Sequence, residues 1–199
     1  MKKYIRENIE ESVNAKKRLL ESKELLDMIE KVSSLCIEAY RNGNKILVCG
    51  NGGSASDAQH MTGELVGRYK MERAGIPAIS LNANTTVLTA LGNDYDYDRI
   101  FAKQVKALGN PGDILIGIST SCNSANIVEA VCQAAKQGIH TVALTGESGG
   151  KLKLLSDYVI NVPSSDTPRI QEMHILIIHV ICGIIEKELY NSGYFGEQE

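Results

Sequence analysis

The sequence lacks tryptophan and contains only two phenylalanines and four prolines among its 199 residues. It also lacks an excess of positive charge, because 24 acidic residues outnumber 21 lysines and arginines. A protein that binds nucleic acid regardless of its base sequence needs a basic surface to neutralise phosphates. The charge balance therefore argues against that class of function, and we expect no nucleic acid partner.

Long apolar segments are also missing. The most apolar stretch, ILIIHVICGII at 175–185, is shorter than the roughly 20 residues that a membrane-spanning helix needs, and it contains His179. The charged N-terminus, MKKYIRENIEES, is not followed by the apolar segment of a signal peptide. The five cysteines are odd in number and show no C-x-x-C spacing, which favours reduced thiols. Together these absences predict a cytoplasmic protein without a membrane partner.

What the sequence does contain is a regular alternation of helical and strand-like segments. A helical pattern with a break near Ser22 covers residues 3–42. The strands are expected at 45–50, 76–81, 113–119, 141–146 and 158–163, and the helices between and after them at about 54–69, 84–91, 97–108, 124–137, 149–155 and 168–190. Apolar runs without polar alternation suit parallel strands that are buried on both faces. This order predicts one α/β domain over 1–199, a three-layer, doubly wound, five-stranded parallel sheet with a helical extension at 1–42 and a long C-terminal helix.

The first predicted strand leads into the glycine-rich stretch CGNGGSASDAQH. Its glycines at positions 50, 52 and 53 allow a sharp turn and a close approach of the backbone to a ligand. Ser54 or Ser56 can cap the following helix, whose N-terminus favours an anion. A tight turn without a ligand explains the same residues. A dinucleotide-binding dehydrogenase is disfavoured, because the second strand ends in SLNAN rather than in an acidic residue.

The third predicted strand leads into a run of hydroxyl side chains, ISTSCNS. Ser119, Thr120, Ser121 and Ser124 offer donors at the start of a helix, which is how a protein binds a phosphate group without lysine. Hydroxyl-rich turns also serve as plain helix caps, so both readings stay open at this point.

Several of these stretches together resemble one known family. CGNGGS, GNDY, ISTSxNSANI, ALTGxxGGK and RIQEMH are similar to the sugar isomerase (SIS) domain family and, within it, to the phosphoheptose isomerases. The match covers nearly the whole chain. The resemblance implies an aldose–ketose isomerase that converts sedoheptulose 7-phosphate to D-glycero-D-manno-heptose 7-phosphate through an enediol, as the first step of nucleotide-activated heptose synthesis. It further implies a homotetramer with active sites at subunit interfaces, in which residues 1–42 take part.

Four side chains in two predicted helices are candidate metal ligands. His60 and Glu64 lie four residues apart and share a helix face, although such a pair is more often an exposed polar pair than a metal site. Gln171 and His179 lie two four-residue steps apart, about 80° round the helix, so both can face one pocket. A core histidine is the simpler reading of His179 without the family. By the resemblance, all four correspond to a zinc site with one ion per subunit, although these ligands also suit cobalt or nickel.

The implied chemistry assigns roles to two of these residues. Isomerisation moves a proton between C1 and C2, and it needs a base at carbon, an acid at the carbonyl oxygen and stabilisation of the developing negative charge. We expect Glu64 to be the base and His179 the acid, with the metal polarising the carbonyl. A glutamate held by a metal is a weaker base, and the sequence leaves this tension open.

The resemblance also implies a set of substrate-binding residues. They are Asn51, Gly52, Gly53, Ser54, Glu64, Asn93, Asp94, Ser119, Thr120, Ser121, Ser124 and Gln171. Ordinary turn chemistry explains the Asn–Asp pair equally well. Asp166 and Arg169 are further candidates for the wall of the same pocket.

Cys122 departs from the family pattern, which usually has glycine there. No histidine lies near it in the sequence, so we expect neither a nucleophile nor a metal ligand. We interpret it as a substitution within the phosphate-binding loop. If the backbone at this position has a positive φ, cysteine carries a steric cost that glycine avoids.

Two non-enzymatic functions are alternatives to the isomerase. A closely similar SIS protein is a non-catalytic tetramer that binds the replication initiator protein, but it lacks the acidic residue at position 64 and the histidine at position 179. This chain has both, which favours the enzyme. A phosphosugar-sensing regulator would need a DNA-binding domain, for which the sequence shows no candidate segment.

Overall fold

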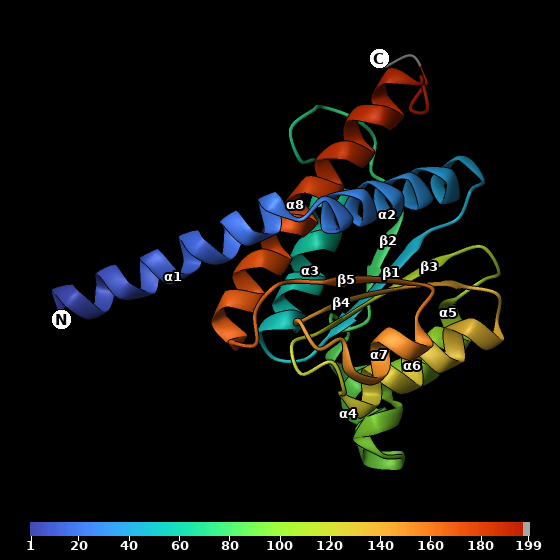
Figure 1. Ribbon diagram of the computed structural model, residues 1–199. Coiled ribbons are helices and arrows are strands. Elements are labelled where there is room, and N and C mark those ends of the chain that lie inside the picture. Colours follow the sequence, from blue (N-terminus) through green and yellow to red (C-terminus); the bar gives the residue numbers. More distant parts are fainter. Residues whose placement is uncertain (197–199) are drawn as a thin grey trace.

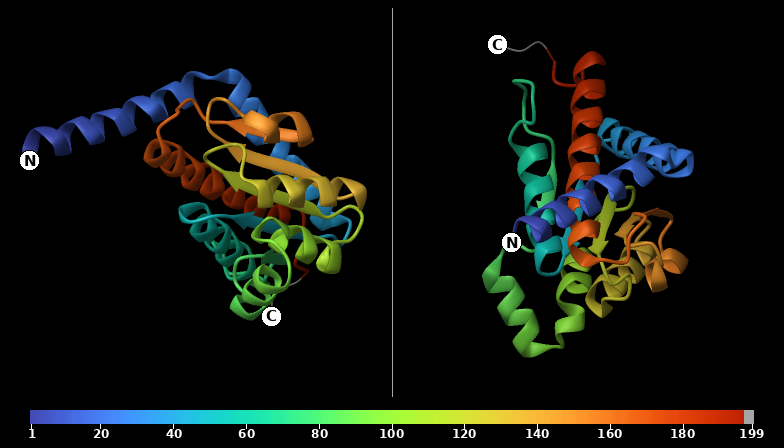
Figure 2. Two further views of the ribbon diagram at one scale, coloured as in Figure 1. Left: turned by 90° about the horizontal axis from the view of Figure 1, so that it is seen from below. Right: turned by 60° about the vertical axis from the view of Figure 1, so that its left-hand side comes forward.

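The computed structural model describes residues 1–196 and begins with two helices (Figure 1). They are α1 (Lys2–Glu21) and α2 (Lys23–Arg41). Ser22 separates them, and its hydroxyl accepts a hydrogen bond from the backbone N–H of Leu25 at 3.3 Å, which caps α2. The predicted break is therefore confirmed. The N-terminal part of α1 extends beyond the rest of the molecule (Figures 1 and 2).

The rest of the chain alternates strands and helices around one parallel sheet. The strands are β1 (Ile46–Gly50), β2 (Ala78–Ser80), β3 (Ile114–Ser119), β4 (His140–Thr145) and β5 (Tyr158–Asn161). The helices are α3 (Gly53–Val66), α4 (Thr85–Asp94), the 3₁₀ turn η1 (Tyr97–Arg99), α5 (Ile100–Leu108), α6 (Ala125–Lys136), α7 (Gly150–Leu155) and α8 (Thr167–Asn191). The predicted doubly wound α/β fold is confirmed, with Pro168 in the first turn of α8.

The sheet separates two apolar cores, as expected for strands buried on both faces. In β1, Val48 joins the core formed with α2, α3 and α8, whereas Leu47 joins the core formed with α5 and α6. Figure 1 shows the two helical layers, with α2, α3 and α8 on one side of the strands and α4 to α7 on the other. Within residues 1–196, no helix combines the length and apolar character that crossing a membrane requires.

Helix α8 is attached to the end of β4 by a buried histidine. His174 is fully buried, and its Nε2–H donates to the carbonyl oxygen of Thr145 at 3.3 Å. Burial lowers the pKa of His174 to about 4, against the raising effect of this hydrogen bond, so the ring is neutral at physiological pH. The core histidine of the RIQEMHILIIHV segment is therefore His174 and not His179.

The strand order puts two ligand-binding loops next to each other. The order is β2-β1-β3-β4-β5, and all neighbouring pairs are parallel. The chain reverses its winding direction between β1 and β3, and ligands of such sheets bind beyond the carboxyl ends of the strands at this point. The glycine-rich loop after β1 and the hydroxyl-rich loop after β3 meet there.

Candidate active site

The loop after β1 depends on glycine at two positions. Gly52 has a φ of 56° and is the residue before the first turn of α3. A side chain at Gly50 would collide with the backbone carbonyl of Ser54. The prediction that Ser54 or Ser56 caps α3 was wrong: both lie inside the helix, because the turn needs a left-handed residue at the cap position and glycine adopts that conformation without strain.

A reciprocal amide pair links this loop to α6. The Asn51 side chain donates to Asn126 Oδ1 at 2.8 Å, and the Asn126 side chain donates back to Asn51 Oδ1 at 2.9 Å. Asn126 is 2% exposed and lies in the first turn of α6, so this pair fixes the two loops relative to each other. Asn126 was not among the predicted site residues, although its place just after the hydroxyl run was a usable signal.

Three hydroxyl groups converge at the start of α6. The Oγ atoms of Ser119 and Ser124 are 2.9 Å apart, and Ser121 Oγ lies 3.3 Å from each of them. Thr120, the fourth predicted residue, is half-buried in the same loop. The hydroxyls stand at the N-terminus of a helix, where unpaired N–H groups and the helix dipole favour an anion.

Cys122 lies in this loop with a left-handed backbone. Its φ is 63°, and it is the only non-glycine residue with a positive φ within residues 1–196. Its side chain is buried, and the Ser148 hydroxyl donates to its sulfur at 3.5 Å. The sulfur therefore packs against the loop that follows β4 and points away from solvent.

Cys122→Gly is expected to be about 1 kcal/mol more stable than Cys122→Ala. Both changes remove the thiol, but only glycine avoids the steric cost of a positive φ, which is roughly 1–2 kcal/mol. The larger conformational entropy of glycine in the unfolded state offsets part of this gain. Urea unfolding of the two variants measures the difference. An alanine variant as stable as the glycine variant would contradict the strained loop.

Three of the four predicted metal ligands lie close together in the structure, and they come from two helices. His60 and Glu64 lie on α3 and His179 on α8. The His60 and His179 Nε2 atoms are 2.8 Å apart, and Glu64 Oε1 lies 3.0 Å from the first and 3.8 Å from the second. One ligand atom from each residue lies within 4.8 Å of the others. Two imidazole nitrogens and a carboxylate oxygen without a thiolate suit zinc, cobalt or nickel, so these residues fit the implied metal.

Gln171, the fourth predicted ligand, lies next to the glycine-rich loop. A side chain at Gly53 would collide with the Nε2 atom of Gln171, so glycine at the start of α3 provides the space for this amide. Its roles as a metal ligand and substrate contact stay predictions, as does the substrate contact of Ser54, which is buried in the first turn of α3.

Asp57, a neighbour of the His60–Glu64–His179 cluster, was not among the predicted site residues. Burial raises the pKa of Asp57 to about 6, against the lowering effect of His60. Within the described residues, its Oδ2 atom is buried and has no hydrogen-bond partner. The signal was available, because Asp57 precedes His60 by three residues on the same helix face.

The remaining predicted residues do not join these clusters. Asn93 and Asp94 are exposed at the end of α4, where the amide of the first donates to the carboxylate of the second at 2.9 Å. Helix α4 packs mainly against α5 and η1. Arg169 donates to the Asn8 carbonyl on α1 at 2.7 Å and to Glu172 at 2.6 Å, and its place in the pocket wall stays a prediction. Asp166, exposed just before α8, has no side-chain cap hydrogen bond.

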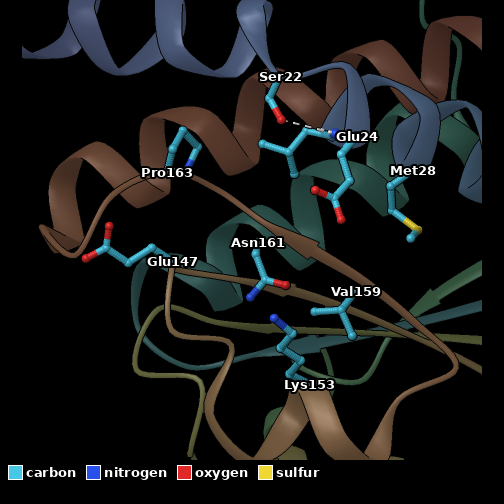
Figure 3. Close-up of a pocket in the computed structure, with 9 residues that line it drawn as sticks. Ser22, Glu24, Met28, Glu147, Lys153, Val159, Asn161 and Pro163 are labelled. Carbon is cyan, nitrogen blue, oxygen red and sulfur yellow. Dashed lines mark hydrogen bonds between the residues drawn. The ribbon is translucent and has the colours of Figure 1, made fainter.

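A separate cavity of about 350 Å³ lies between the junction of α1 and α2 and the end of β5. Figure 3 shows Glu24, Glu147 and Lys153 around it. None of the predicted site residues lines this cavity, so it does not belong to the metal and hydroxyl clusters.

Comparison with known proteins identifies the family. The SIS domain family matches residues 10–146. The phosphoheptose isomerase of Sulfurimonas denitrificans is 52% identical over 97% of this chain and 99% of its own length.

Solved structures agree with the sequence comparison. The phosphoheptose isomerase from Neisseria gonorrhoeae superposes with a TM-score of 0.88 at 43% identity, over 94% of this chain and 98% of that one. The enzyme from Francisella tularensis gives 0.89 at 41% identity, over 93% of this chain and 97% of that one. The chain therefore belongs to the SIS domain family and, within it, to the phosphoheptose isomerases, which makes it a phosphosugar isomerase.

Proposed function

We propose that this protein converts sedoheptulose 7-phosphate to D-glycero-D-manno-heptose 7-phosphate in the cytoplasm, as the first step of nucleotide-activated heptose synthesis. The observation that carries the proposal is the convergence of His60, Glu64 and His179, beside loops that also hold a triangle of hydroxyls at a helix N-terminus. A proton-transfer centre and an anion site are the two parts that isomerisation of a phosphosugar requires.

Glu64 acts as the base at carbon in this proposal. Its carboxylate takes a proton from C1 of the ketose and returns it to C2, which passes through an enediol. Oε1 is the atom that faces both histidines, at 3.0 and 3.8 Å, and this leaves Oε2 for the substrate proton. The division of the carboxylate between two tasks eases the conflict between metal binding and basicity.

His179 acts as the general acid at the carbonyl oxygen. Its ring is 35% exposed, and it delivers a proton to the carbonyl oxygen while Glu64 works at carbon. A zinc ion held by His60, Glu64, Gln171 and His179, one per subunit, would supply Lewis-acid polarisation of that oxygen. Asn51, Gly52, Gly53, Ser54, Asn93, Asp94 and Gln171 complete the proposed substrate-binding set.

The phosphate group binds at Ser119, Thr120, Ser121 and Ser124 in this proposal. We expect Ser124→Ala to raise KM roughly tenfold or more with little change in kcat, because a hydrogen bond to a charged group contributes about 1.5–3 kcal/mol and the phosphate does not react. Competitive inhibition by inorganic phosphate should weaken by the same factor. Ser148→Ala, which removes a hydroxyl from the loop after β4, is the control. Equal inhibition constants for wild type and Ser124→Ala would place the phosphate elsewhere.

Helix α1 supports the proposed homotetramer. Ile5, Ile9 and Val13 form a stripe with four-residue steps and are 56%, 59% and 45% exposed. The N-terminal part of α1 extends beyond the rest of the subunit (Figure 1). Burial of this stripe against other copies would use residues 1–42 in assembly and bring active sites to subunit interfaces, to which α4 would contribute Asn93 and Asp94.

The test of the activity is direct. The zinc-loaded protein is incubated with sedoheptulose 7-phosphate, and NMR follows the appearance of the aldose. Unphosphorylated sedoheptulose is the matched control and should react far more slowly, because it cannot occupy the hydroxyl site. Failure to form any aldoheptose 7-phosphate would overturn the proposed substrate while leaving the family membership intact.

A further inference from the structure

We propose that Tyr69 is a positioning residue that fixes the ring of His179, and that the segment 69–71 is built onto α8 for this purpose. The proposal rests on the proposed function for the use of His179, but its structural core is independent of the reaction. It concerns the contact between two rings, which can be measured without metal or substrate.

The two rings are stacked. Their centroids are 5.8 Å apart and the ring planes differ by 20°. The His60 ring meets His179 from another direction, edge-on, with centroids 4.9 Å apart and an angle of 71°. His179 is therefore held between one ring along its face and another at an angle, with Nε2 directed at His60 and Glu64.

His179 needs such a contact because its second nitrogen is not anchored. Ligand histidines in metal sites usually donate their other ring N–H to a protein group, which fixes the plane of the ring. Among residues 1–196, no hydrogen bond reaches Nδ1 of His179, whose Nε2 faces His60. Stacking on Tyr69 supplies the orientation that a hydrogen bond supplies elsewhere.

Helix α8 provides a place for the tyrosine ring. Gly183 follows His179 by one turn, and a side chain there would come within 3.1 Å of Tyr69 Cε1. The missing side chain leaves a flat surface on which the ring lies. Tyr69, His179 and Gly183 also border one cavity of about 520 Å³, so both rings form part of its wall.

The backbone of the same segment is bound one turn further along α8. Glu186 Oε1 accepts from the Tyr69 N–H at 3.0 Å, and Oε2 accepts from Lys70 and Met71 at 2.8 and 3.1 Å. The carboxylate is 2% exposed and also pairs with Arg73 at 3.1 Å. Positions 179, 183 and 186 lie on one face of α8, and each contacts the segment that carries Tyr69.

Tyr69→Leu and Tyr69→Phe separate the ring from the hydroxyl. Both leave the backbone hydrogen bonds to Glu186 in place, so the fold should persist. In metal-free, histidine-labelled protein, NMR should show an upfield displacement of the His179 ring signals in wild type and Tyr69→Phe that is lost in Tyr69→Leu. The His179 signals are assigned by their disappearance in His179→Gln.

Steady-state kinetics and zinc affinity provide the second measurement. Tyr69→Leu should lower kcat about three- to tenfold, the factor that corresponds to one stacked ring pair, with KM within about twofold of wild type. Zinc affinity from chelator competition should fall about tenfold, and Tyr69→Phe should match wild type in both. If wild type does not turn over the heptulose phosphate, the ring signals and zinc affinity still decide the proposal.

Gly183→Ala tests the same contact from the helix. Its new methyl group displaces the Tyr69 ring, while alanine favours the helix, so the His179 signals should move without loss of thermal stability. The proposal is overturned if the His179 signals are unchanged in Tyr69→Leu and Gly183→Ala, or if Tyr69→Phe loses as much zinc affinity as Tyr69→Leu.

Discussion

Glu64→Gln is expected to lower kcat by a factor of about 10² to 10⁴ while the protein remains folded. The amide has the shape of the carboxylate but cannot take a proton from carbon, so the loss falls on the chemical step. His179→Gln should have an effect of the same order. Initial rates with the heptulose phosphate give kcat, and circular dichroism reports the fold.

Glu30→Gln, on the exposed face of α2, is the matched control and should retain full activity. If Glu64→Gln retains more than about a tenth of wild-type kcat/KM, the loss of transition-state stabilisation is less than about 1.4 kcal/mol, and Glu64 is not the base.

Glu186→Ala is expected to lower the free energy of unfolding by about 3–5 kcal/mol. The change leaves the Arg73 guanidinium, whose side chain is 0% exposed, without its buried counter-charge. It also leaves three backbone N–H groups without their hydrogen-bond acceptor. Urea unfolding measures the loss. Glu188→Ala, exposed on the same helix, should change stability by no more than about 0.5 kcal/mol. Equal effects of the two changes would contradict the account of the buried pair.

The contribution of Glu186 to the free energy of unfolding should also depend on pH. Burial alone would raise the pKa of Glu186, but the backbone N–H donors and Arg73 outweigh burial and hold the pKa below its usual value. A group with a lowered folded-state pKa stabilises the protein above its ordinary pKa, and the contribution is lost as pH falls through the lowered value. The stability difference between wild type and Glu186→Ala should therefore narrow in acid.

The fold was largely predictable because its signals are local. Apolar runs such as 113–119 and glycines at turns mark buried parallel strands and their exits, and the structure confirms them. The cap of α3 was not predictable from residue preference. Serine is the better cap residue in general, but the chain needs a φ of 56° at Gly52, and this requirement outweighs the preference.

The site was predictable only in part because its parts come from distant segments. The four-residue step from His60 to Glu64 is visible in the sequence, whereas His60 and His179 are 119 residues apart and were joined only by the family resemblance. Periodicity could not distinguish His174 from His179, because both are surrounded by apolar residues. Tyr69 had no local signal, since its role depends on Gly183 and Glu186 more than a hundred residues away.

The central claim is that Glu64 moves a proton between C1 and C2 of the sugar phosphate. The most direct measurement is the reaction of the zinc-loaded protein with sedoheptulose 7-phosphate in D₂O, with NMR of the aldose product. We expect deuterium at C2 in at least part of the product, because a proton held on a carboxylate exchanges with solvent, and we expect Glu64→Gln to form product about 10² to 10⁴ times more slowly. Product that carries no deuterium at C2, or product formed at the wild-type rate by Glu64→Gln, would contradict the claim.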